Sequence, residues 1–205
     1  MPSRACADLN ERLREIDQLL EAHGALTRLK RAEAALAAST QSLQNVAQVV
    51  NALVTPPGVG RPAEVQALNK AAIALLSAHL QGYVEDVFEE VGRVLLHGRV
   101  PQIDALLTQA QRRGNPNWDN ITRLFAAIGF ADILNAISWR GVSNATLKKR
   151  LRELNELRNR IVHGQTETVR KRVVVKYSSF VRQFAARLDR TVAQVYAALT
   201  GQAPW

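Results

Sequence analysis

Apolar residues recur three or four positions apart along almost the whole of this 205-residue chain, and strand-like alternation is rare. The longest stripe lies between about Ala63 and Leu96, and its members are Leu68, Ala72, Leu76, Leu80, Tyr83, Val87, Val91 and Val94. Helices with one apolar face become stable when those faces pack against each other. The sequence therefore predicts an all-α fold, built as a helical bundle.

Breaks in this spacing divide the chain into two parts. The strongest break is "VTPPGVGRP", residues 54–62, which contains three prolines and two glycines. It separates an N-terminal helical hairpin with its Pro/Gly linker, residues 1–62, from a helical domain, residues 63–205. Within the hairpin, we expect one helix from about Ala7 to Ala22 and a stop at His23-Gly24. A second helix is expected over residues 25–53.

Four helices are expected after the long one in the C-terminal part. They cover about residues 102–112, the segment "ITRLFAAIGFADILNAIS" (121–138), residues 145–163, and a last stretch from near Thr166 or Thr168 to Leu199. The second of these four is expected to be capped by Asn117, Asp119 or Asn120, and the third by Ser143 or Asn144. The β-branched "VRKRVVVKY" could be partly extended, although the sequence after it is helical.

Cysteine content and hydropathy narrow the class of protein. Cys6 is the single cysteine, which excludes an internal disulfide and a cysteine-based metal site and predicts a reducing, cytoplasmic compartment. The N-terminal residues lack the apolar core of a signal peptide. The longest apolar run, "AAIALLSAHL", is shorter than the roughly 20 residues that span a bilayer. We therefore expect no membrane partner.

Positive charge is concentrated in one segment. The net charge is +9, and residues 140–190 contain 14 Lys and Arg against 4 acids, whereas the other residues contain 13 against 14. A one-sided basic field favours a polyanion, either nucleic acid or an acidic protein, over the alternative of a solvated arginine-rich helix face. If the polyanion is RNA, the residues expected to bind its phosphates are Lys148, Lys149, Arg150, Arg160, Arg170, Lys171 and Arg172.

Arg158 occupies an unusual place within the same basic segment. On a helix over residues 145–163, it lies within about 20–30° of the centre of the apolar face formed by Leu147, Leu151, Leu154, Leu157 and Ile161. An unpaired buried guanidinium is unfavourable. It therefore either extends outward or pairs with a structural carboxylate, or it has a functional role.

His163 ends this helix and is followed by Gly164. His-Gly pairs also occur at residues 23–24 and 97–98, where a helix-terminating role is expected, but only His163 follows an arginine within the basic segment. Five positions separate Arg158 from His163, which corresponds to about 140° of rotation and about 7.5 Å of rise. If the two residues act together, two copies packed across a two-fold axis would bring both groups into one cleft, so a homodimer through these helices is expected.

"LRNRIVHG" resembles the Arg-x4-6-His motif of the HEPN superfamily, with Asn159 as the polar residue that often follows the arginine. "ALLSAHLQGYVEDVF", "NWDNITRLFAAIGFADIL" and "ISWRGVSN" resemble segments of the subgroup named for its RiboL-PSP association. The resemblance covers roughly residues 64–200. It implies a HEPN-type bundle that dimerises through the motif helices, and metal-independent RNA cleavage, often in toxin–antitoxin or phage-defence systems. A cognate antitoxin or operon partner is an expected partner in such systems.

Carried over to this sequence, the resemblance implies that Arg158 and His163 are catalytic and that Asn159 supports them. The residue types suit RNA cleavage by the neighbouring 2′-hydroxyl, because histidine can move a proton at neutral pH and arginine can hold a charged phosphate. No metal or other cofactor is expected. Gln81 stands where an acid would be expected, so the source of a counter-charge for Arg158 stays open.

Two other functions compete with a ribonuclease that leaves 2′,3′-cyclic phosphate and 5′-hydroxyl ends. One is a non-catalytic HEPN-like module that binds RNA or protein through the same basic face. The other is a helical DNA-binding protein, for which the sequence lacks a helix-turn-helix signature. The presence of both Arg158 and His163 favours the enzyme, because a binding module has no need of the histidine.

Overall fold

The computed structural model describes residues 1–37, 65–96, 100–112 and 115–205. Its helices are α1 (Arg4–Ala37), α3 (Gln66–Leu95), α4 (Val100–Arg112), α5 (Trp118–Ala126), the 3₁₀ helix η2 (Ile133–Ala136), α6 (Asn144–Val162) and α7 (Lys171–Thr200). In these ranges the only β pairing is an isolated bridge between Trp139 and Val142. The predicted all-α bundle is therefore confirmed.

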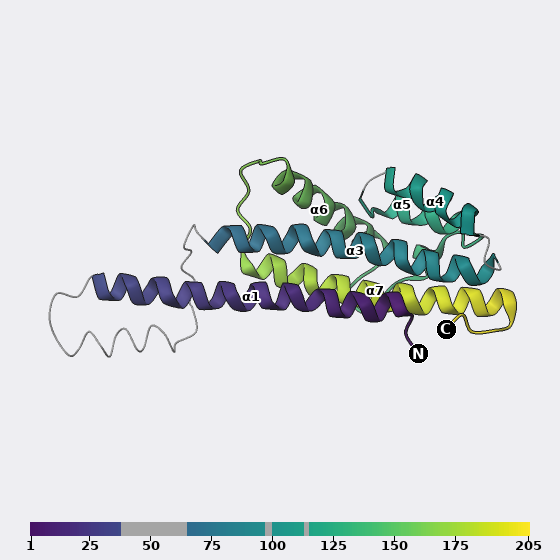
Figure 1. Cartoon of the computed structure of the whole chain (residues 1–205), viewed down its shortest axis with the longest axis horizontal. Helices are drawn as coiled ribbons and strands as arrows, with labels where there is room; N and C mark the ends of the chain where they lie inside the picture. Colours follow the sequence, from purple (N-terminus) through teal and green to yellow (C-terminus); the bar gives the residue numbers. More distant parts are fainter. Residues whose placement is uncertain (38–64, 97–99, 113–114) are drawn as a thin grey trace.

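Three long helices form the base of the bundle. α1, α3 and α7 run side by side, and α6 packs against α3 together with the shorter α4 and α5 (Figure 1). One continuous core connects them, and among its fully buried members are Leu13, Leu80, Leu151 and Phe184. Because side chains of α1 belong to this core, α1 is an integral part of the bundle. The predicted domain boundary at residue 62 lies outside the described residues.

The predicted helix end at His23-Gly24 is wrong, because α1 continues through both residues to Ala37. Thr27 Oγ1 donates to the His23 carbonyl at 2.7 Å, as in a regular helix. A β-carbon at Gly24 would lie 3.9 Å from Lys171 Nζ of α7, which is an ordinary contact distance, and Thr27 and Ala32, which follow the pair, are buried. Tertiary packing thus outweighs the roughly 1 kcal/mol disadvantage of an interior glycine. The helix predicted over 25–53 is consequently part of α1 as far as Ala37.

The helix predicted over residues 121–138 is also wrong in extent, since α5 ends at Ala126. The backbone turns through two residues with positive φ, Gly129 at 89° and Asp132 at 57°, before η2 begins. The turn allows apolar side chains on both sides of it, including Phe125 and Phe130, to be buried in the same core. A single straight helix would place some of them in solvent.

The remaining boundaries agree with the sequence more closely. Asn117 Oδ1 accepts from the Asn120 amide at 2.8 Å, and Ser143 Oγ accepts from the Thr146 amide at 3.3 Å, so both helix caps are side-chain caps. The last helix begins at Lys171, a few residues later than predicted, and its β-branched segment is fully helical from there.

Within the described ranges, no helix is long and apolar enough to cross a membrane.

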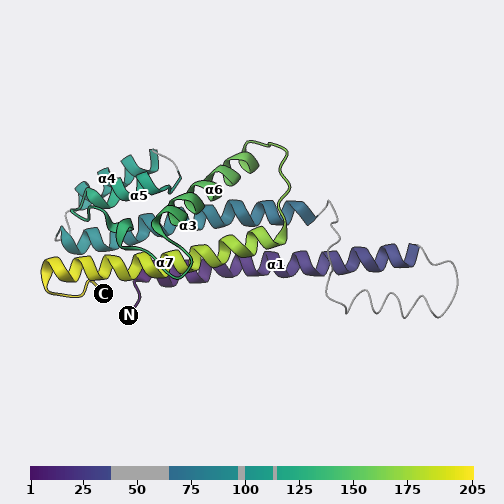
Figure 2. The ribbon, with the colours of Figure 1, turned by 180° about the vertical axis from the view of Figure 1, so that it is seen from behind.

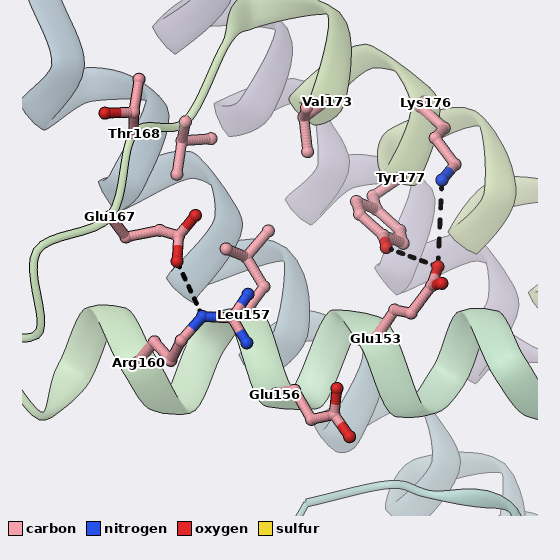
Figure 3. Close-up of a pocket in the computed structure, with 10 residues that line it drawn as sticks. Glu153, Glu156, Leu157, Arg160, Glu167, Thr168, Val173, Lys176 and Tyr177 are labelled. Carbon is pink, nitrogen blue, oxygen red and sulfur yellow. Dashed lines mark hydrogen bonds and ion pairs between the residues drawn. The ribbon is translucent and has the colours of Figure 1, made fainter.

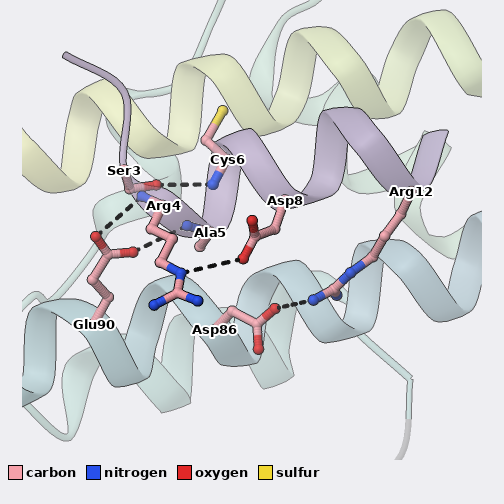
Figure 4. Close-up of polar contacts among 8 residues, drawn as sticks. All are labelled: Ser3, Arg4, Ala5, Cys6, Asp8, Arg12, Asp86 and Glu90. Atoms are coloured by element: carbon pink, nitrogen blue, oxygen red, sulfur yellow. Dashed lines mark hydrogen bonds and ion pairs between the residues drawn. The ribbon is translucent and has the colours of Figure 1, made fainter. Parts of the chain in front are cut away.

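The start of α1 is fixed to the bundle by carboxylates of two other helices. Glu90 of α3 accepts the backbone amides of Arg4 and Ala5 at 3.1 Å each, and Arg12 pairs with Asp86 at 2.9 Å (Figure 4). Asp189 of α7 accepts from the Ser3 amide and hydroxyl. Negative groups at a helix N-terminus are stabilising. These contacts hold α1, α3 and α7 as one layer beneath α6.

Candidate functional site

The motif helix α6 is held in place by a row of buried leucines. Leu147, Leu151 and Leu154 are fully buried, and Leu157 is 7% exposed. A tight turn, with the bridge between Trp139 and Val142, leads into the Ser143 cap and sets the start of α6. The final turn of α6 is less buried, and its Arg158, Asn159 and Arg160 side chains are each partly exposed.

Arg158 takes part in a small amide network. Its Nη1 donates to Asn159 Oδ1 at 3.2 Å, and Asn115 Nδ2 donates to the same oxygen at 2.9 Å. Asn115 belongs to the loop before α5, and its carbonyl accepts from Asn120 Nδ2 at 3.0 Å. The loop therefore fixes Asn159, and Asn159 in turn orients the guanidinium of Arg158. The supporting role of Asn159 in catalysis stays a prediction.

The next feature is the surroundings of Arg158 and the groups that could compensate its charge. In the part of the chain that the structure describes, Arg158 makes no ion pair, and its only side-chain hydrogen bond is to the neutral Asn159. Gln81 of α3 donates to Glu85 at 3.0 Å. Asn155, one turn before Arg158, is 7% exposed, and neither atom of its amide has a hydrogen-bond partner among the described residues. The guanidinium thus keeps its charge uncompensated and partly accessible, as a phosphate-binding group requires.

His163 stands at the C-terminal end of α6 with its side chain in solvent. Its backbone amide still donates to the Asn159 carbonyl at 2.9 Å. Gly164 follows with φ of 69°, and the amides of Gly164 and Gln165 donate to the carbonyls of Ile161 and Arg160 at 3.2 and 2.9 Å. These two bonds form a Schellman motif. His163 is therefore a helix-terminating residue, and its imidazole nevertheless remains available for chemistry.

Arg158 and His163 occupy different sides of α6. Glu156, Arg160 and His163 follow one another at helical spacing on one side, whereas Arg158 lies about 140° from His163. The side with His163 borders a cavity of about 310 Å³ between α6, the segment 164–170 and α7. Arg158 lies on the side that contacts the loop before α5 through Asn159.

Two clusters of charged and polar side chains line the cavity (Figure 3). At one end, Arg160 Nε donates to Glu167 Oε2 at 2.7 Å. Further along, Glu153 accepts from the Tyr177 hydroxyl at 3.2 Å and lies 4.0 Å from Lys176 Nζ. Burial, followed by the nearby Glu153 carboxylate, raises the pKa of Tyr177 to about 12. Tyr177 is therefore a neutral hydrogen-bond donor at physiological pH.

The predicted RNA-binding residues have diverse surroundings. Lys148 and Lys149 lie 3.7 and 3.8 Å from carboxylates of Asp119 and Glu153. Arg150 lies over the Phe180 ring at 5.7 Å, and Lys171 Nζ donates to the Leu20 carbonyl at 3.2 Å. Arg160 is paired with Glu167, whereas Arg170 and Arg172 are exposed at the start of α7. The structure thus brings Asn159 next to Arg158 but scatters the basic residues over α6 and α7.

Sequence reasoning missed two residues of this region. Asn115 is one of several turn-forming residues in "RRGNPNWDN", and nothing in that pattern marks it as the partner of Asn159. Glu167 is an acid seven residues after Arg160, so a local ion pair could have been considered. In the ranges described, no three or more His, Cys, Asp or Glu side chains are arranged to hold a metal ion.

We expect the Arg160–Glu167 pair to position the turn that follows His163. If the protein cleaves RNA, as the resemblance implies, breaking this pair, which is 42% and 25% exposed, with Arg160→Ala or Glu167→Ala should lower the maximal cleavage rate modestly, by roughly two- to fivefold. The charge-exchanged double variant Arg160→Glu/Glu167→Arg should recover part of the loss. Steady-state kinetics on RNA measure this, with Arg152→Ala as a control that removes an exposed arginine from the same helix.

The opposite result would identify Arg160 as an RNA ligand. In that case, Glu167→Ala would release Arg160 and strengthen RNA binding, while Arg160→Ala would raise KM and leave the maximal rate unchanged. The two roles therefore predict opposite effects for the same Glu167 substitution.

Comparison with known proteins gives one finding. The family model described as RiboL-PSP-HEPN matches residues 36–194, which extend from the end of α1 through α3, α5 and α6 into α7. No curated protein and no solved structure matches the chain. The matched range includes the complete motif helix and the loop that holds Asn159. The chain therefore belongs to the RiboL-PSP-HEPN family.

Proposed function

We propose that this protein is a metal-independent endoribonuclease of the HEPN type. The observation that carries the proposal is the partly exposed Arg158, which has no ion pair among the described residues and is held by Asn159 on the same helix end that presents an exposed His163. Membership of a family that includes many ribonucleases supports it. Cleavage of RNA by the purified protein, measured beside His163→Ala, is the experiment that tests it.

The residues suit distinct steps of such a reaction. The 2′-hydroxyl of the nucleotide before the scissile phosphate attacks the phosphorus, and His163 moves a proton during this attack or to the departing 5′-oxygen. Arg158 stabilises the negative charge that develops on the phosphate oxygens. The amide network around Asn159 keeps the guanidinium in one orientation, which reduces the reorganisation required during the reaction.

The proposed site contains residues of two chains. Arg158 and His163 are offset by about 140° on α6, so a two-fold pairing of α6 helices is the arrangement that brings an arginine of one copy near a histidine of the other. Val162, between them in the final turn, is 53% exposed and offers an apolar contact for such a pairing. The basic segment and the family setting further suggest RNA substrates, a cytoplasmic location and a role in toxin–antitoxin or phage-defence systems, with a cognate antitoxin as partner.

Subunit mixing tests the shared site. A dimer of one Arg158→Ala chain and one His163→Ala chain still contains one intact arginine and one intact histidine. Co-expressed variants are therefore expected to cleave RNA at least about tenfold faster than either variant alone, because loss of a general acid–base group lowers the rate by roughly 10²–10⁴-fold. Differential tags allow the mixed dimer to be purified, and the separately purified homodimers serve as controls. Mixed dimers no more active than their parents would exclude a site of this composition.

A non-catalytic module that binds RNA or protein is the competing function. It predicts that wild-type protein and His163→Ala are equally inert in a cleavage assay while both retain binding. Because His163 is exposed and its side chain makes no contact that the bundle needs among the described residues, its substitution separates the two functions without disturbing the fold.

A further inference from the structure

The outer face of α7 carries a row of polar side chains that points away from the core. Arg172, Lys176, Ser179, Gln183, Arg187 and Arg190 are all exposed and follow one another at spacings of three or four residues, which places them on one side of the helix. We call them the α7 row. From first to last residue the row extends over about 27 Å at 1.5 Å per residue. The only acid of α7, Asp189, is 5% exposed and bonded to Ser3.

The arginines of the α7 row differ from the basic residues of α6 in their surroundings. Lys148, Lys149 and Arg152 of α6 each lie within 3.8 Å of a carboxylate, that of Asp119, Glu153 and Glu156 respectively. Arg172, Arg187 and Arg190 have neither an ion pair nor a hydrogen bond to any residue that the structure describes. Among the described residues, these three arginines are therefore free to bind an external anion.

The row begins beside the motif and leads away from it. Val173 and Lys176 line the same cavity as Arg160, Tyr177 contacts Glu153, and Phe180 lies under Arg150, so α7 runs antiparallel to α6. Arg172 therefore lies near the end of α6 that carries the motif, and Arg187 and Arg190 lie at the far end. Seen from behind, α7 crosses the face of the molecule beside α6 (Figure 2).

From this arrangement we propose that the α7 row is a second RNA-binding surface, which holds the phosphate backbone of the substrate outside the Arg158–His163 site. The inference rests on the proposed ribonuclease function and assigns the route of the RNA. Arginines bind phosphates through paired N–H groups, and the hydroxyl and amide of Ser179 and Gln183 are suitable further donors. An acidic protein is the less suitable partner, because protein interfaces are centred on buried apolar residues, which the row lacks.

Salt dependence of RNA binding tests the proposal. Binding of a fluorescent single-stranded RNA is measured between low and moderate salt in a His163→Ala background, in which cleavage is negligible during the measurement. Each single-strand phosphate contact contributes about 0.7 to the slope of log K against log salt. The triple variant Arg172→Ala/Arg187→Ala/Arg190→Ala should therefore lower the slope by about 2. The control triple Arg14→Ala/Arg93→Ala/Arg152→Ala removes the same charge from three arginines that each pair with a carboxylate, and it should lower the slope by less than about 1.

A second variant separates charge from folding. Arg172→Lys/Arg187→Lys/Arg190→Lys keeps the charges and should keep most of the slope. Equal loss of slope in the row triple and the control triple would overturn the proposal, because binding would then follow total charge. Displacement of the RNA by poly-glutamate as readily as by unlabelled RNA at equal charge would also overturn it, in favour of an acidic protein. If the His163→Ala protein binds no RNA at all, both the proposed ribonuclease function and the role of the α7 row are wrong. If it binds RNA and the row triple keeps the same slope, only the role of the α7 row is wrong.

Discussion

His163→Ala is expected to lower the rate of RNA cleavage by roughly 10²–10⁴-fold while RNA affinity stays close to that of the wild type. The physical reason is that the substitution removes a proton-transfer group and leaves the cationic groups in place. Among the described residues, His163 contributes only its backbone to the structure, through the bond from its amide to Asn159. Single-turnover cleavage of a labelled RNA measures the rate, and equilibrium binding to a non-cleavable RNA measures the affinity.

The fold should tolerate this substitution. His163 has φ of −81° and ψ of 12°, which alanine adopts readily, and the left-handed position that ends the helix belongs to Gly164. Gln165→Ala, which changes the neighbouring exposed residue, serves as the matched control and should cleave at nearly the wild-type rate. Expression in a bacterial host should arrest growth with the wild type only. An unchanged rate in His163→Ala would mean that another group moves the proton.

The sequence predicted the class of fold because the apolar spacing has a helical period throughout. It failed where a local signal had to be weighed against packing. The His23-Gly24 pair has the composition of a helix end, yet α1 passes through it, because residues after the pair, such as Thr27 and Ala32, are buried in the bundle. Conversely, the segment after Ile121 keeps a helical apolar pattern, yet the chain turns at Gly129 and Asp132. In both cases the deciding contact comes from residues distant in sequence.

The candidate site shows the same division. Arg158, Asn159 and His163 were identified from one short motif, because that motif lies within a single helix and its geometry follows from the helix itself. Asn115 is 44 residues away from Asn159 and reaches it only through the packing of the loop before α5. Sequence alone also could not show which basic residues pair with a carboxylate. Whether an arginine is paired, as Arg160 is, or exposed without a partner among the described residues, as Arg187 is, depends on which helix faces it.

A single 2′-deoxynucleotide immediately before the scissile phosphate is expected to abolish cleavage at that phosphate. The proposed nucleophile is the 2′-hydroxyl of that nucleotide. Without it, no group attacks the phosphorus, and His163 has no proton to transfer. Cleavage at other phosphates of the same molecule should continue at an unchanged rate. The products should carry 2′,3′-cyclic phosphate and 5′-hydroxyl ends, and the same sequence as DNA should remain intact.

Product analysis of a chimeric oligonucleotide measures this outcome. Mass spectrometry identifies the ends, and a second oligonucleotide with the deoxynucleotide placed one position later serves as the control, since it keeps the nucleophile at the tested phosphate. Added chelator should leave the rate unchanged, because the proposed nucleophile belongs to the RNA and does not require a metal-activated water. Cleavage at the deoxy position, or fragments that begin with a 5′-phosphate, would assign the attack to water. Arg158 could then still bind the phosphate, but His163 would have to act on a water molecule, and the reaction would belong to a different mechanistic class.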